Sequence, residues 1–132
     1  MRGEVENVIK LPKTLVGEPK FRVVLYSTPL DSILDALEAL IRQPFGCFEQ
    51  TSSTTYPMVM ALKLIREFKK QYELIGDHDR LSEVIDMEHR ILKWLKEGYE
   101  KLITFETSSK GYEWFGDAPG HEALTSYGLG QF

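Results

Sequence analysis

The chain contains a single cysteine, Cys47, and a glutamine, Gln50, follows it three positions later. If residues 47–50 form a turn, the two side chains lie within reach of each other. A cysteine thiolate beside a carboxamide carbon can attack that carbon, expel ammonia and leave an internal thioester. The pair therefore indicates acyl-transfer chemistry, although this spacing alone also arises by chance.

Several other roles for Cys47 remain open at this point. A lone cysteine excludes an intrachain disulfide and zinc sites built from several thiolates. It leaves a buried apolar filler, which is common for free cysteines, an exposed reactive thiol, or a covalent partner of another group. Gly46 precedes the cysteine and permits a tight turn. We expect Cys47 at, or just before, the N-terminal end of a helix.

Composition limits the class of protein. The 132 residues suffice for one modest domain, and the net charge is -4 with both signs mixed along the chain. That balance argues against nucleic acids and anionic membranes as partners, because both call for a basic patch. No run of 18 apolar residues exists and no signal peptide is recognisable. His78 and His89 lie among acidic residues, but solvated helix faces are favoured over a metal site.

The positions of the candidate residues depend on the elements around them. Residues 21–26 are rich in strand-forming side chains, and residues 8–11 are a weaker strand candidate. A helix is predicted for residues 29–42, with Thr28 as its cap and a proline at its first position. Residues 43–46 end it and lead directly to Cys47.

Three more helices are predicted after the cysteine. The first runs from about Met58 to Tyr72 and is apolar nearly all round at its start, so we expect it in the centre, with Pro57 in its first turn or kinking it. The next runs from a capped break at 76–79 to about Ile103. The last begins at His121 or Glu122 and continues to the end of the chain. These patterns predict a mainly α fold of helical hairpins, and the aromatic residues at 112–115 are expected to anchor a loop rather than form an exposed patch.

The wider sequence around Cys47 is far more specific than the pair alone. Residues 44–53, Pro-Phe-Gly-Cys-Phe-Glu-Gln-Thr-Ser-Ser, resemble the thioester motif of the alpha-2-macroglobulin and complement family. Phe48 stands where vertebrate members usually have glycine, and it resembles the bacterial branch in this respect. Pro57 and the segments at 96–99 and 119–129 also look like parts of that family's thioester domain. The resemblance extends from roughly Leu15 to Phe132.

The resemblance implies a fold and a site. The fold would be the N-terminal portion of an α/α toroid, with a truncated thioester domain at 28–132 and residues 1–27 entering from a neighbouring β-rich module. Cys47 and Gln50 would form the thioester, with Pro44, Gly46 and Glu49 as the supporting motif.

The resemblance also implies a function. The protein would be a broad-spectrum endopeptidase inhibitor of innate defence that captures proteases or nearby surfaces covalently. It would act once per molecule, and so not as an enzyme, without metal or cofactor, beside adjoining domains of the full-length protein. It would work outside the cell or in the bacterial periplasm, without direct membrane contact. Some members have a downstream histidine that receives the acyl group, but none of His78, His89 and His121 matches its position.

Two rival functions stay open. A helical protein-interaction module with an unformed thioester would use the same helices without the chemistry. A lipid-processing enzyme of toroid architecture is disfavoured because the chain lacks an Asp-Asp-x-x-Asp pattern.

Overall fold

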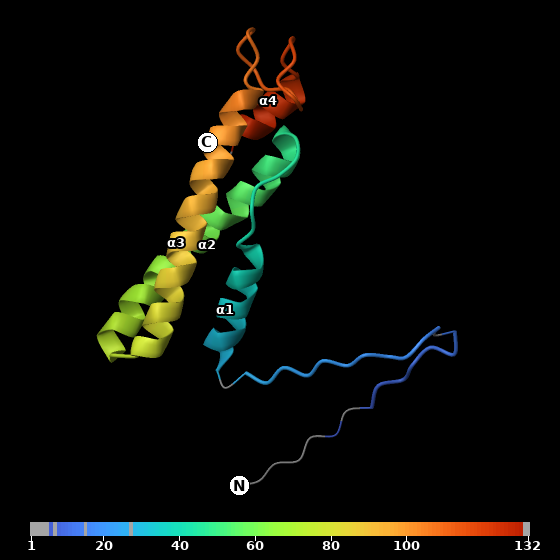
Figure 1. The fold of residues 1–132 in the computed structure, drawn as a ribbon, viewed down its shortest axis with the longest axis vertical. Helices are drawn as coiled ribbons and strands as arrows, with labels where there is room; N and C mark the ends of the chain where they lie inside the picture. The colour runs from blue at the N-terminus through green and yellow to red at the C-terminus, as the bar shows by residue number, and fades with distance from the viewer. Residues whose placement is uncertain (1–5, 7, 15, 27, 131–132) are drawn as a thin grey trace.

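The protein is a helical hairpin with shorter helices packed near its two ends (Figure 1). The computed structural model describes residues 6, 8–14, 16–26 and 28–130. In chain order, its elements are α1 (Pro29–Leu40), α2 (Phe48–Ile75), α3 (His78–Leu102), a short 3-10 helix η1 (Ile103–Phe105) and α4 (Glu122–Leu129). The prediction of a mainly α fold is confirmed. No helix in this described part is long and apolar enough to cross a membrane.

Helix α1 begins as the sequence predicts. The Thr28 hydroxyl accepts a hydrogen bond from the Asp31 amide at 3.3 Å, and the Asp31 carboxylate accepts one from the Thr28 amide at 3.1 Å. This reciprocal arrangement satisfies two donors that a helix start would otherwise leave free. The helix ends at Leu40 because the backbone of Ile41 is extended.

The prediction that the second helix starts at about Met58 is wrong, because helix α2 begins at Phe48. Serine and threonine favour turns when their hydroxyls compete with the helix for backbone groups. Here the hydroxyls of Thr54 and Thr55 donate to carbonyls one turn earlier, at 2.8 and 3.0 Å, and both residues are buried. Tertiary packing thus outweighs weak helix propensity. Pro57 lies inside the helix, beyond its first turn.

The connection between α2 and α3 follows ordinary capping rules. Gly76 has a φ of +73°, a left-handed conformation that suits glycine, and its amide donates to the Tyr72 carbonyl at 3.0 Å. The Asp77 side chain then accepts the Arg80 amide at 3.1 Å and caps α3. The break at 76–79 and the helix that follows it are confirmed, and Arg80 also pairs with Asp31 to join α3 to α1.

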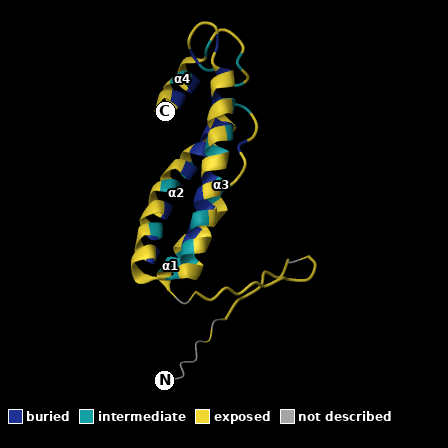
Figure 2. Cartoon of the chain, turned by 60° about the vertical axis from the view of Figure 1, so that its left-hand side comes forward, coloured by how far each residue is buried: buried dark blue, intermediate teal, exposed yellow. Residues whose placement is uncertain are grey.

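The described buried side chains form two groups that hold the helices together. Figure 2 marks buried positions along the helices in dark blue. The hairpin core joins α1, α2 and α3 and comprises Leu34, Leu37, Met58, Ala61, Ile65, Phe68, Tyr72, Val84, Met87 and Ile91. The Phe48 cluster lies where α2 begins and α3 ends, and it comprises Phe48, Leu102, Phe105 and Leu124, with Tyr112 and Trp114 packed against it.

Most of the N-terminal segment stands away from the helices (Figure 1), and it meets α1 at Tyr26, whose hydroxyl donates to the Asp35 carboxylate at 2.9 Å. Its described residues, from 6 to 26, are exposed, and none of them belongs to a strand. The strands predicted at 8–11 and 21–26 are therefore absent from this structure. Strand-forming side chains need a neighbouring strand or a packing surface, and isolated pairs are marginal in water.

Candidate functional site

Cys47 and Gln50 meet across the first turn of α2. Cys47 is the N-cap residue and Gln50 is the third helical residue. The Cys47 amide donates a hydrogen bond to the Gln50 side-chain oxygen, Oε1, over 3.1 Å. The prediction that Cys47 lies at a helix start is confirmed, and the glutamine carboxamide folds back toward the cysteine.

Gly46 makes this return of the Gln50 side chain possible. Its φ is +78°, which is strained for any residue with a side chain. A Cβ at position 46 would also lie only 1.8 Å from Gln50 Oε1 and 2.7 Å from its Cδ. A side chain here would therefore displace the carboxamide from the turn, so this position needs glycine for two independent reasons.

The Cys47 amide has a chemical consequence for the Gln50 carboxamide. Attack on Gln50 Cδ by any nucleophile moves negative charge onto Oε1, which this amide already contacts. A donor fixed where charge develops lowers the barrier without reorganisation during the reaction. The dipole of α2 adds positive potential at the same place, because the turn lies at the N-terminal end of the helix. The turn thus combines a nucleophile, an electrophilic carbon and an oxyanion donor.

Pro44 fixes the chain that enters the turn. It is buried, and it lies opposite Gly98 of α3, where an added Cβ would be 3.0 Å from its Cγ and 2.0 Å from Thr55 Cγ2. The Thr51 hydroxyl donates to the Phe45 carbonyl at 3.2 Å. Because Gly98 lets α3 approach this closely, the segment before Cys47 is held between α2 and α3.

Phe48 fixes the other side of the turn. Its side chain has no exposed surface, and its ring stacks on Tyr112 at 4.7 Å and meets Phe105 edge-on at 6.2 Å. Gly128 of α4 gives the ring its space, since a Cβ there would lie 2.5 Å from Phe48 Cζ. Burial also raises the pKa of the Tyr112 phenol, which keeps it neutral inside the cluster.

The loop between η1 and α4 closes over the start of α2. The Phe48 amide donates to the Trp114 carbonyl at 3.0 Å, so a free donor of the helix start is satisfied by the loop. The Trp114 ring lies edge-on against His121 at 4.7 Å. The expected anchoring role of the aromatic loop is confirmed for Tyr112 and Trp114, whereas Phe115 is 73% exposed.

Two pockets flank the turn. The Gln50 pocket, of about 210 Å³, is lined by Leu40, Arg42, Phe45, Gln50, Ser53, Thr54 and Pro57. The Glu49 pocket, of about 230 Å³, is lined by Glu49, Trp114, His121, Ala123, Leu124 and Tyr127. The neighbouring side chains of Glu49 and Gln50 therefore line different cavities. The Glu49 carboxylate also complements the positive end of α2, in whose first turn it lies.

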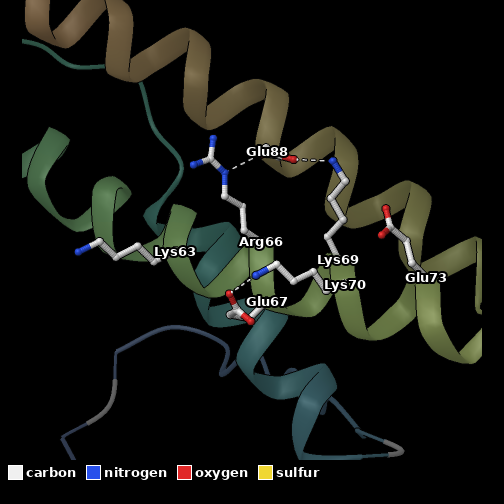
Figure 3. A pocket seen from close by; sticks show the side chains of 7 residues that line it. All are labelled: Lys63, Arg66, Glu67, Lys69, Lys70, Glu73 and Glu88. Atoms are coloured by element: carbon white, nitrogen blue, oxygen red, sulfur yellow. Dashed lines mark hydrogen bonds and ion pairs between the residues drawn. The ribbon is translucent and has the colours of Figure 1, made fainter.

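A larger charged pocket, of about 430 Å³, lies away from this turn (Figure 3). It is lined by Lys63, Arg66, Glu67, Lys69, Lys70, Glu73 and Glu88. Arg66 and Lys69 both bind the Glu88 carboxylate, at 2.8 and 3.0 Å. His78 and His89 belong to no group of potential metal ligands among the described residues.

A comparison with known protein families shows which family the chain belongs to. The family model of the A-macroglobulin TED domain matches residues 23–132. The chain belongs to this family. The matched region of the TED domain contains the Cys47–Gln50 turn, both flanking pockets and all the described helices.

Sequence patterns alone left several site-forming residues without a role. Phe48 was only a departure from the vertebrate motif, yet it anchors the turn. Gly98 and Gly128 create the space for Thr55, Pro44 and Phe48. An isolated glycine inside a helical pattern is a signal of close packing, and this signal could have found both glycines. Arg42 carries no comparable signal, because its relation to Gln50 depends on the fold of residues 41–47.

Proposed function

We propose that this TED domain forms an internal thioester between Cys47 Sγ and Gln50 Cδ and transfers the Gln50 acyl group once to an external nucleophile. The observation that carries the proposal is the 3.1 Å hydrogen bond from the Cys47 amide to Gln50 Oε1. The turn that contains this bond requires glycine at position 46. Family membership supports the same chemistry.

The proposed reaction has two balanced steps. In the first, the Cys47 thiol adds to Gln50 Cδ, the C–N bond breaks, and ammonia leaves with the thiol proton. In the second, an amine or hydroxyl adds to the same carbon, and the C–S bond breaks. The product is an amide or ester at Gln50, and Cys47 takes up the proton as a free thiol. Because ammonia has been lost, the thioester does not re-form, and the protein acts as a single-turnover trap.

Family membership supports a setting for this chemistry. We propose that α1 to α4 belong to an α/α toroid and that the domain serves an alpha-2-macroglobulin-like inhibitor of endopeptidases, outside the cell or in a periplasm. Its targets would be proteases and nucleophile-bearing surfaces. The antiparallel pairing of α2 and α3 supports the toroid, since helical hairpins are its repeating unit.

Intact-mass measurement before and after methylamine treatment tests the proposal. We expect a mass lower by one ammonia than the sequence requires, and a Cys47 that resists iodoacetamide until methylamine is added. Gln50→Ala should abolish both effects, whereas Gln71→Ala, on the exposed surface of α2, should preserve them. A full-length protein that retains its ammonia and has an alkylatable Cys47 would contradict the proposal.

That contrary result would favour a second candidate, a helical interaction module. Helix α2 presents exposed apolar side chains, Tyr56, Val59, Met60 and Leu64, which suit a protein partner. Such a module would need no bond between Cys47 and Gln50.

A further inference from the structure

The Gln50 pocket differs from the Glu49 pocket in charge. Among the described residues that line it, Arg42 alone is charged, and the others are apolar or carry a hydroxyl or an amide. Glu49, the acidic residue of the first turn of α2, lines the opposite pocket. A molecule that reaches Gln50 Cδ through the Gln50 pocket therefore passes a cation that no carboxylate in the pocket wall neutralises.

The Arg42 guanidinium is free to bind such a molecule. Its Nη2 atom donates to the Ala39 carbonyl at 3.4 Å, and the ion pairs found within the described parts of the chain do not include it. A guanidinium has five N–H donors, so most of them stay available. Their planar arrangement matches carboxylate and phosphate groups.

Two hydroxyls complete the polar lining. Ser53 Oγ and Thr54 Oγ1 donate to the backbone carbonyl of Gln50 at 3.1 and 2.8 Å. With their hydrogens engaged, these oxygens offer acceptor lone pairs. They can therefore accept a hydrogen bond from the N–H or O–H of a nucleophile that enters this pocket.

We propose that the Gln50 pocket receives the nucleophile and that Arg42 makes it select amines or hydroxyl compounds that carry a carboxylate or phosphate near the reacting group. This inference rests on the proposed thioester. The nucleophile's nitrogen or oxygen bonds to Gln50 Cδ, the bond to Cys47 Sγ breaks, and the nucleophile's proton goes to Sγ, which leaves as the free thiol. The anionic group stays on Arg42, whereas a second cation on the nucleophile is repelled.

Three primary amines of similar length test this selection: β-alanine with a carboxylate, propylamine without a second charge, and a diaminopropane with a second ammonium. Transfer to Gln50 is followed by intact mass at low salt, with rates corrected for the unprotonated fraction of each amine. We expect β-alanine to react about tenfold faster than the diamine, because the attraction of the carboxylate and the repulsion of the second ammonium each contribute a few-fold, and the ratio should fall in high salt.

Three variants test whether Arg42 causes the selection among the amines. Arg42→Gln should remove the difference among the amines, and Arg42→Glu should reverse their order. Arg22→Gln removes the same charge from the exposed N-terminal segment and should leave the order unchanged. Equal selectivity in the wild type and in Arg42→Gln would overturn the inference while leaving the proposed thioester intact.

A second measurement covers the case in which no amine is transferred and the proposed function fails. Gln50 then keeps its carboxamide, whose side-chain N–H signals are visible by NMR. Sodium acetate should shift these signals in the wild type but not in Arg42→Gln, and methylammonium chloride should shift them in neither. Signals that acetate leaves in place, or moves equally in both proteins, would overturn the inference.

Discussion

The hairpin core and the Phe48 cluster are built in different ways. The hairpin core consists mainly of aliphatic side chains and methionine at helical spacing on α1, α2 and α3. The Phe48 cluster brings together residues from the start of α2, the end of α3, a 3-10 helix, a loop and α4, and its central contacts are aromatic. Phe48 is adjacent to Cys47, whereas the first residue that α2 contributes to the hairpin core is Met58.

Because of this difference, we expect the hairpin core to determine the stability of the fold and the Phe48 cluster to determine the position of the Cys47–Gln50 turn. Aliphatic cores tolerate changes of shape when volume is kept, because neighbouring side chains repack. A ring held between Tyr112 and the backbone of Gly128 has no such freedom. Changes to the hairpin core should therefore alter the free energy of unfolding, and changes to the Phe48 cluster should alter the Cys47–Gln50 turn.

The largest loss of stability is expected from Ile65→Ala. Ile65 has no exposed surface, and removing its side chain leaves a cavity between α2 and α3, at a cost of about 2–5 kcal/mol in the free energy of unfolding. Urea unfolding followed by circular dichroism measures the loss. Leu64→Ala, at a neighbour that is 40% exposed, is the matched control and should cost much less. Acyl transfer by the folded fraction of Ile65→Ala should equal that of the wild type, and a slower transfer would break the separation of the two regions.

A smaller loss of stability but a direct effect on the turn is expected from Gly128→Ala. The new Cβ would lie 2.5 Å from Phe48 Cζ and force the ring to move, which costs about 1–3 kcal/mol. Because Phe48 is adjacent to Cys47, thioester formation measured by intact mass should fall more than stability alone explains.

Two further variants sharpen the test at Gly128. Gly130→Ala adds the same methyl group where its nearest neighbour would be 3.5 Å away, an ordinary contact, so it should behave as the wild type. Phe48→Leu combined with Gly128→Ala should recover part of the thioester, since the smaller side chain leaves room for the methyl. If Gly130→Ala impaired the turn as much as Gly128→Ala, clearance around Phe48 would not be the cause.

The two regions also differ in how far the sequence predicts them. The hairpin core follows from helical spacing, and α1, α3 and the start of α4 lie close to their predicted positions. The start of α2 could not be predicted from propensity, because the hydroxyls that stabilise it do so only when buried. The Phe48 cluster joins residues that are distant in the chain, so no local pattern reveals it.

The candidate site, too, is predicted by the sequence only in part. The spacing of Cys47 and Gln50, and the glycine before them, are visible in the sequence, and the structure places the two residues on one turn. The charge of the Gln50 pocket is not visible, because Arg42 reaches it only through the path of residues 41–47. Strand-forming composition at 21–26 was misleading, since composition does not supply a partner strand.

The smallest effect is expected from a change at Glu88. It is also the most selective test of whether the hairpin core and the Phe48 cluster act separately. Its carboxylate on α3 binds Arg66 and Lys69 of α2 beside the hairpin core (Figure 3). Hydrogen bonds from Arg66 and then Lys69 hold its pKa below the ordinary value of 4.5. A lowered folded-state pKa means that the stabilisation is complete above the unfolded value and is lost as the pH falls through the folded one.

Glu88→Gln should therefore cost about 1 kcal/mol at neutral pH, since both cations are partly exposed, and the difference from the wild type should disappear in acid below pH 4.5. Urea unfolding across this pH range measures it. Glu67→Gln breaks an exposed pair with Lys70 and should change little at any pH. Because Glu88 touches the hairpin and not the Phe48 cluster, acyl transfer should be unaffected at neutral pH. A change in transfer would mean that the packing of α2 against α3 reaches the turn without passing through Phe48, and the two regions would then act as one.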